Sequence, residues 1–86
     1  MRIFFHKDFE KGYKKLPPQE QKRFDERLIV FVQDPFDQIL RNHPLRGKLK
    51  GYRSVNITSD LRAIYKFQGN DEFIFVVIDS HSNLYK

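Results

Sequence analysis

The fold of this chain is decided by residues 61–79, LRAIYKFQGNDEFIFVVID. Residues 61–67 and 72–79 are rich in β-branched and aromatic side chains, and the Gly-Asn-Asp at 69–71 is typical of a tight hairpin connection. The segment therefore predicts two antiparallel strands. The second strand is apolar at every position from 73 to 78, which indicates a central strand with a neighbour on each side.

A third strand is predicted immediately upstream, over residues 49–57, with the turn residues 58–60 leading into the hairpin. Because side chains alternate between the two faces of a strand, Val55 and Ile57 are expected to point into the core. The same alternation assigns an open face to the side chains of Tyr52, Ser54, Asn56, Arg62, Ile64 and Lys66.

Two helices are predicted before these strands. Phe9, Tyr13 and Leu16 are spaced four and three residues apart, which predicts a helix over residues 7–16. Pro17 and Pro18 end this helix and can begin a second one, because proline is tolerated in the first turn. Helical spacing of apolar residues then continues toward position 34. The apolar run 28–32 also suits a buried strand, but no turn signal separates it from the helix before it.

Residues 2–5 predict an opening strand, so the element order is β-α-α-β-β-β. This order predicts an α+β domain in which the N-terminal strand and the helical hairpin pack on one face of a small antiparallel sheet. The opposite face is then left open. With 86 residues, no internal repeat and no linker, we expect one domain over residues 1–86.

The composition excludes several classes of protein. The absence of Cys excludes a disulfide framework, a thiol nucleophile and the usual zinc sites. His6, His43 and His81 show no metal-ligand spacing, so we expect neither a metal nor a cofactor. The apolar run at residues 3–5 is too short for a signal peptide, and no stretch approaches the roughly 20 apolar residues of a membrane span. We therefore expect a cytoplasmic protein that does not contact membranes.

Positive charge is concentrated in residues 41–66. The whole chain has a net charge of +5, whereas this stretch alone has seven basic residues and one acidic residue. Such a local field favours contacts with phosphates, although a solvated basic face explains the charge equally well. Arg53 also shares the alternation of the core-facing residues, so it can instead brace the sheet edge. The cations predicted to contact RNA are Arg46, Lys48, Lys50, Arg53 and Lys66.

The same half of the chain contains the residue types that metal-free RNA cleavage requires. That chemistry needs one group to remove the 2′-hydroxyl proton, one to protonate the leaving 5′ oxygen, and cations near the phosphorus. His43, Asp60 and His81 are the available proton carriers. Arg62 adds a cation, and Tyr85 can stack on a splayed base. Plainer roles stay open, because His43 can be an ordinary loop residue and Asp60 a turn cap.

Three blocks of sequence stand in a recognisable order in this half. They are His43-Pro44-Leu45-x-Gly47-x-Leu49-x-Gly51-Tyr52-Arg53, Asp60-Leu61-Arg62-x-Ile64-Tyr65 and His81-Ser82-x-Leu84-Tyr85. On these blocks the chain resembles the RelE/ParE toxin superfamily, and most closely its YafQ-like mRNA interferase branch. The predicted element order also matches the fold of those toxins.

The resemblance implies a toxin of a type II toxin-antitoxin system. Its activity would be that of a ribosome-dependent endoribonuclease that cuts mRNA in the A site by 2′-hydroxyl attack. The implied partners are a cognate antitoxin, mRNA and ribosomal RNA. Arg62 matches a catalytic Arg of RelE-type members. The catalytic set of the YafQ-like branch falls here on His43, Asn56, Asp60, His81 and Tyr85.

Asn56 departs from the YafQ-like pattern, which has a His in this strand. An amide cannot transfer a proton, but it can donate a hydrogen bond to a phosphate or a ribose. Proton transfer would then depend on His81 with Asp60 or His43. Two rival functions stay open: a ParE-like toxin that binds a protein target such as DNA gyrase, and a basic RNA-binding domain without catalysis. The residues carried over from the resemblance favour the nuclease.

Overall fold

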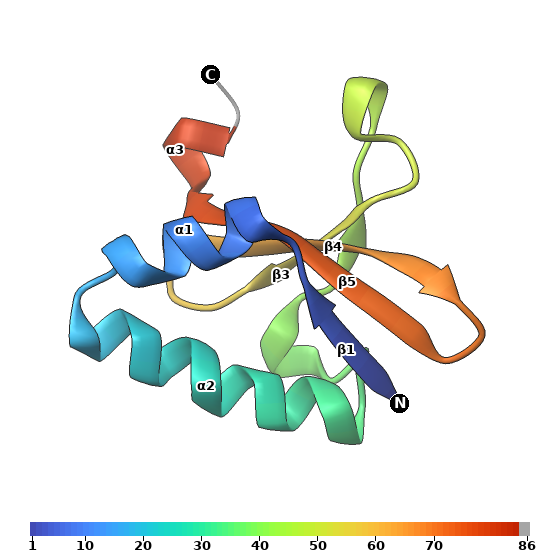
Figure 1. Ribbon diagram of the computed structural model, residues 1–86, viewed down its shortest axis with the longest axis horizontal. Coiled ribbons are helices and arrows are strands. Elements are labelled where there is room, and N and C mark those ends of the chain that lie inside the picture. Colours follow the sequence, from blue (N-terminus) through green and yellow to red (C-terminus); the bar gives the residue numbers. More distant parts are fainter. Residues whose placement is uncertain (85–86) are drawn as a thin grey trace.

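One five-stranded sheet organises the structure, a computed structural model that describes residues 1–84 (Figure 1). The predicted order of a strand, two helices and three strands is confirmed. The structure adds a two-residue strand, two short 3-10 helices and a C-terminal helix. In chain order the elements are β1 (Arg2–Phe5), α1 (Lys7–Lys15), α2 (Pro18–Gln33), η1 (Gln38–Leu40), β2 (His43–Pro44), η2 (Gly47–Leu49), β3 (Arg53–Asn56), β4 (Leu61–Gly69), β5 (Glu72–Ser80) and α3 (His81–Leu84).

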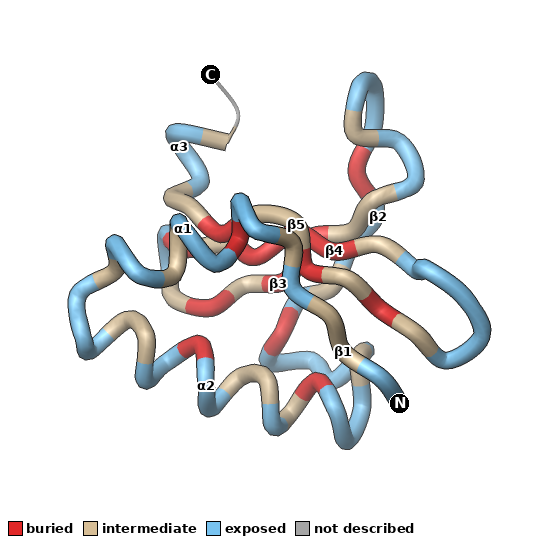
Figure 2. Tube along the Cα trace, in the orientation of Figure 1, coloured by how far each residue is buried: buried red, intermediate tan, exposed pale blue. Residues whose placement is uncertain are grey.

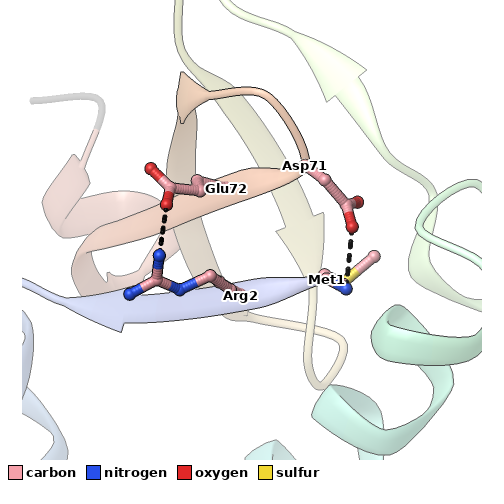
Figure 3. A network of polar contacts seen from close by, with 4 residues as sticks. All are labelled: Met1, Arg2, Asp71 and Glu72. Atoms are coloured by element: carbon pink, nitrogen blue, oxygen red, sulfur yellow. Dashed lines mark hydrogen bonds and ion pairs between the residues drawn. The ribbon is translucent and has the colours of Figure 1, made fainter.

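The strands lie in the order β1-β5-β4-β3-β2, so β5 has a neighbour on each side, as its apolar sequence predicts. The predicted sheet was antiparallel, with the N-terminal strand packed on one face. Instead, β1 is itself an edge strand of the sheet and pairs with β5 in parallel. The other neighbours are antiparallel, so the sheet is mixed. Two ion pairs fasten β1 to the start of β5 (Figure 3). The N-terminal amine of Met1 lies 2.8 Å from Asp71, and Arg2 lies 2.9 Å from Glu72.

Both helices bury aromatic side chains: Phe9 of α1, and Phe24 and Phe31 of α2. Figure 2 marks buried positions along α2. Residues 28–32, whose apolar sequence also suited a buried strand, belong to α2. The Phe31 ring meets Tyr65 edge-on at 4.9 Å and Phe75 at 5.2 Å. Burial of aromatic rings of this size supplies much of the stabilisation of a small core.

A β-bulge between β4 and β5 changes which β5 residues face the core. Tyr65 pairs with Phe75 while Ile64 pairs with Val77, so one β5 residue is unpaired. As a result Phe75 and Ile78, three positions apart, are both buried. The alternation is thereby shifted downstream of the bulge, and Asp79 comes to lie opposite Arg62.

Two expectations about the open face were wrong. Ser54 and Ile64 are on this face but are completely buried, at 0% and 1% exposure. The predicted strand 49–57 is also shorter, because the chain turns through positive φ angles at Gly47 and Gly51. Residues 45–52 instead form a projection, here called the arm, whose base is closed by a 2.9 Å hydrogen bond from the Leu45 N–H to the Tyr52 carbonyl. Leu45, at the base of the arm, is buried as well.

Candidate active site

The arm and α3 stand on the same side of the sheet, and α2 lies on the opposite side (Figure 1). An open hollow of about 520 Å³ is bounded by residues from both segments and from the strands between them. It brings together five of the residues predicted from the sequence to act in catalysis or RNA binding: His43, Arg46, Asn56, Arg62 and His81. The complete lining consists of Arg41, His43, Pro44, Leu45, Arg46, Asn56, Arg62 and His81.

A row of polar side chains crosses the sheet at the level of this hollow. Asn56 of β3 pairs with Arg62 of β4, and Arg62 pairs with Asp79 of β5. Directly opposed residues of antiparallel strands place their side chains on the same face, roughly 5 Å apart. An amide, a guanidinium and a carboxylate are therefore neighbours on the open face. Sequence reasoning missed Asp79, because regular alternation assigns it to the core face.

The Arg62 guanidinium holds the turn that precedes its own strand. Its Nη1 donates to the carbonyls of Thr58 at 2.9 Å and Leu61 at 3.2 Å, and its Nη2 donates to Ser59 at 3.1 Å. The Thr58 hydroxyl closes the same turn by accepting from the Leu61 N–H at 2.9 Å. Since a guanidinium has five N–H groups, some remain for a substrate phosphate.

The turn at residues 58–61 also positions His81. The Asp60 carbonyl accepts from the His81 N–H at 2.8 Å, which fixes the first residue of α3. Asp79 Oδ1 accepts from the Ser80 N–H at 2.7 Å and from the Asn83 amide at 3.1 Å. The Asp60 carboxylate is exposed and does not line the hollow. Asp60 therefore contacts the site through its main chain.

The remaining predicted residues lie in different places. Arg46, Lys48 and Lys50 are exposed on the arm, and Arg46 alone of these lines the hollow. Lys66 reaches back to the arm, with its ammonium 5.4 Å from the Tyr52 ring. Arg53 is turned away from the hollow: its Nε donates to Asn42 at 2.8 Å, and its guanidinium lies 5.1 Å from the Phe36 ring. Tyr85 lies outside the described residues.

A second hollow, of about 530 Å³, lies between β1, α1 and α2, and four of its eight lining residues are aromatic. At this hollow the Tyr13 hydroxyl donates to the exposed Asp25 carboxylate at 2.9 Å. Burial raises the pKa of Tyr13, and the Asp25 carboxylate raises it further. The lining contains no His, so this hollow offers no imidazole for proton transfer.

Within residues 1–84, no group of three or more His, Cys, Asp or Glu side chains is arranged to hold a metal ion. In the same residues, no helix has the length and apolar character needed to cross a membrane.

Solved structures with the same sheet and pair of helices are known. The structure of YafQ from Escherichia coli strain BL21(DE3) superimposes with a TM-score of 0.83 at 21% identity, over 100% of both chains. YafQ in the E. coli DinJ-YafQ complex gives a TM-score of 0.72 at 23% identity, again over 100% of both chains. The endoribonuclease HigB of Proteus vulgaris is 30% identical over 94% of this chain and 99% of its own length.

A family described as the bacterial toxin of type II toxin-antitoxin systems, YafQ, matches residues 1–86. This chain belongs to that YafQ toxin family, within the superfamily that also includes RelE, YoeB and HigB. The predicted fold class is thereby confirmed.

Proposed function

We propose that this chain is an endoribonuclease that cuts mRNA in the ribosomal A site and is held inactive by a cognate antitoxin. The observation that carries the proposal is that His43 and His81, from opposite sides of the open face, line one hollow with Arg62. The relative HigB is named an endoribonuclease, which supports RNA as the substrate. The complex of YafQ with DinJ supports an antitoxin as the partner.

Two imidazoles in one hollow suit cleavage by 2′-hydroxyl attack. In this proposal His43 accepts the 2′-hydroxyl proton as that oxygen bonds to phosphorus. The bond from phosphorus to the 5′ oxygen breaks, and His81 donates a proton to that oxygen. The products are a 2′,3′-cyclic phosphate and a free 5′-hydroxyl. Imidazole suits both tasks because it ordinarily changes charge near neutral pH.

Arg62 and Asn56 bind the phosphate and ribose between the two imidazoles. The N–H groups of Arg62 that the turn does not use can stabilise charge developing on the phosphoryl oxygens. Asn56 donates a hydrogen bond but moves no proton. We assign Asp60 a supporting role through its carbonyl, since its carboxylate is exposed outside the hollow. Stacking by Tyr85 stays a prediction.

The shape of the site supports dependence on the ribosome. The hollow is open, so the protein encloses little of a single-stranded substrate and cannot alone hold a codon in line for attack. Precise alignment of reacting atoms supplies a large part of catalysis, and here the A site would supply it. The exposed cations of the arm would contact ribosomal RNA phosphates.

The test is to add the protein to a translating extract and map mRNA 5′ ends by primer extension. We expect new ends inside codons with the wild-type protein, only when ribosomes are present. His81→Ala and His43→Ala should reduce these ends by about 100-fold or more, as expected for loss of a proton-transfer group. His6→Ala is the matched control, because His6 caps α1 away from the hollow.

Growth arrest without new mRNA ends would overturn this proposal and favour a protein target such as gyrase. RNA binding without toxicity would instead favour a non-catalytic RNA-binding domain.

A further inference from the structure

Asn42, the residue before β2, is bound on three sides. Its Nδ2 donates to the Pro35 carbonyl at 2.9 Å and to the Tyr65 hydroxyl at 2.7 Å. Its Oδ1 accepts from the Arg53 Nε at 2.8 Å. A guanidinium can only donate and a carbonyl can only accept, so these partners determine the orientation of the amide.

The three partners of Asn42 come from separate parts of the fold. Tyr65 is completely buried in β4, and Pro35 follows the end of α2. Arg53 belongs to β3 and is itself held over the Phe36 ring. Asn42 therefore ties the chain entering the candidate site to the core, to the helical layer and to the sheet edge.

The three hydrogen bonds of Asn42 are here called the clamp. Arg41, the residue before Asn42, has a left-handed backbone with φ 46° and ψ 45°. Residues with a Cβ adopt this conformation infrequently, so it needs support from its surroundings. The Arg41 carbonyl lies 2.9 Å from Nδ1 of His43. Since a carbonyl only accepts, Nδ1 must carry the hydrogen. In neutral His43 the lone pair is then on Nε2, the nitrogen left for a substrate.

We propose that Asn42 is a positioning residue that holds the Arg41-His43 turn and so keeps neutral His43 in the Nδ1–H form. This inference rests on the proposed function, in which His43 accepts the 2′-hydroxyl proton. The acceptor in that step is Nε2. Without the clamp, Arg41 leaves the left-handed conformation, and His43 reverts to the Nε2–H form that neutral imidazole side chains favour in water.

His6 provides an internal contrast. Its Nδ1 accepts from the Asp8 N–H at 3.0 Å at the start of α1. His6 must therefore carry its hydrogen on Nε2 when neutral. The structure thus assigns opposite tautomers to two histidines of the same chain.

The tautomers are read directly from imidazole ¹⁵N chemical shifts in long-range ¹H–¹⁵N spectra of the full-length protein. His81→Ala serves as the background, because it leaves only His6 and His43. Well above the ordinary histidine pKa of about 6.5, we expect Nδ1–H for His43 and Nε2–H for His6. Adding Asn42→Ala should convert His43 to mainly Nε2–H and leave His6 unchanged.

The milder variant Tyr65→Phe, which keeps two of the three Asn42 contacts, should shift His43 part of the way. It keeps the test decisive if Asn42→Ala does not fold. A parent spectrum with His43 in the Nε2–H form would overturn the proposal. So would an Nδ1–H form that persists in both variants, because the Arg41 carbonyl would then need no clamp.

Cleavage assays in the His81-containing protein separate positioning from binding. Asn42→Ala should lower kcat about tenfold or more with little change in KM, because Asn42 orients His43 without touching RNA. Asn70→Ala, in the exposed β4–β5 turn, is the matched control and should change neither. An equal kcat for Asn42→Ala and wild type would overturn the proposal. If the wild-type protein cuts no RNA, the proposed function fails, and the NMR result still decides the tautomer.

Discussion

Arg62 illustrates how a single side chain in this site combines two roles. Its guanidinium closes the turn 58–61 through three backbone carbonyls, and that turn holds His81 through the Asp60 carbonyl. The same side chain lines the hollow beside Asn56. A planar guanidinium can do both because its N–H groups point in fixed, divergent directions.

We predict that Arg62→Lys is not a conservative change. The lysine retains the charge but cannot donate to three carbonyls in the same fork geometry, so the turn loosens and α3 loses its anchor. Stability should fall by about 1–2 kcal/mol, and RNA cleavage should fall about tenfold or more. Chemical denaturation and single-turnover cleavage measure the two effects. Wild-type cleavage by Arg62→Lys would show that charge alone suffices.

Several residues of the site were predictable from the sequence because of their side-chain type and the sequence blocks that contain them. His43, Arg46, Arg62 and His81 are polar groups of reactive or cationic type within recognisable blocks, and they line one hollow. Asp79 and Asn42 were not predictable. Asp79 reaches the open face through a bulge, and the three partners of Asn42 are distant from it in sequence.

At the scale of the elements, α1 approaches β5 closely at Gly12. A Cβ on Gly12 would lie 2.9 Å from the Ile78 carbonyl oxygen and 3.2 Å from its Cγ2. The absence of a side chain at Gly12 thus allows α1 to lie directly on β5, the strand that ends at Ser80, one residue before His81.

Gly12→Ala should therefore destabilise the protein despite the better helix propensity of alanine. Propensity alone would add about 1 kcal/mol of stability. The clash involves backbone, which cannot rotate away, and overpacking of this kind costs about 1–3 kcal/mol. We expect a net loss, measured by denaturant unfolding.

Gly69→Ala is the matched control for Gly12→Ala. An added Cβ at Gly69 meets only the end of the flexible Glu72 side chain, at 3.0 Å. Its stability should stay within about 0.5 kcal/mol of wild type. Equal destabilisation by the two variants would show that the close helix-strand contact is not the cause.

At the scale of the whole molecule, the arm displays much of the excess positive charge. Arg46, Lys48 and Lys50 are exposed on it, next to the hollow. The remaining cations of residues 41–66 are partly engaged within the protein, as Arg53 and Lys66 are. The net charge of the chain therefore understates the positive local field beside the hollow.

Replacing Arg46, Lys48 and Lys50 with Gln should weaken RNA binding and flatten its salt dependence. Each phosphate contact with single-stranded RNA contributes about 0.7 to the slope of log K against log salt, so the slope should fall by about 2. Binding is measured by fluorescence anisotropy over a salt series. The control replaces Lys11, Lys14 and Lys15 of α1 with Gln, which changes the net charge equally. Equal effects of the two triple variants would mean that the arm makes no specific phosphate contacts.

The sequence alone determined the order of the elements, the core-facing sides of β3 and β4, and the concentration of charge around the site. These features are local: they follow from the spacing of apolar residues, from turn residues and from the count of charged groups. The apolar run 28–32 also suits a strand, but it is helical like the segment before it, as predicted from the absence of a turn signal between them.

Only the tertiary structure decided how the site is assembled. The β4–β5 bulge places Asp79 opposite Arg62. The positive φ angles at Gly47 and Gly51 turn the chain into the arm where a strand was predicted. Asn42, next to His43, binds Pro35, Arg53 and Tyr65. Each of these depends on strand register or on a contact between distant residues. Periodicity within a segment reports which face is apolar, but it contains no information about the partner that the segment meets.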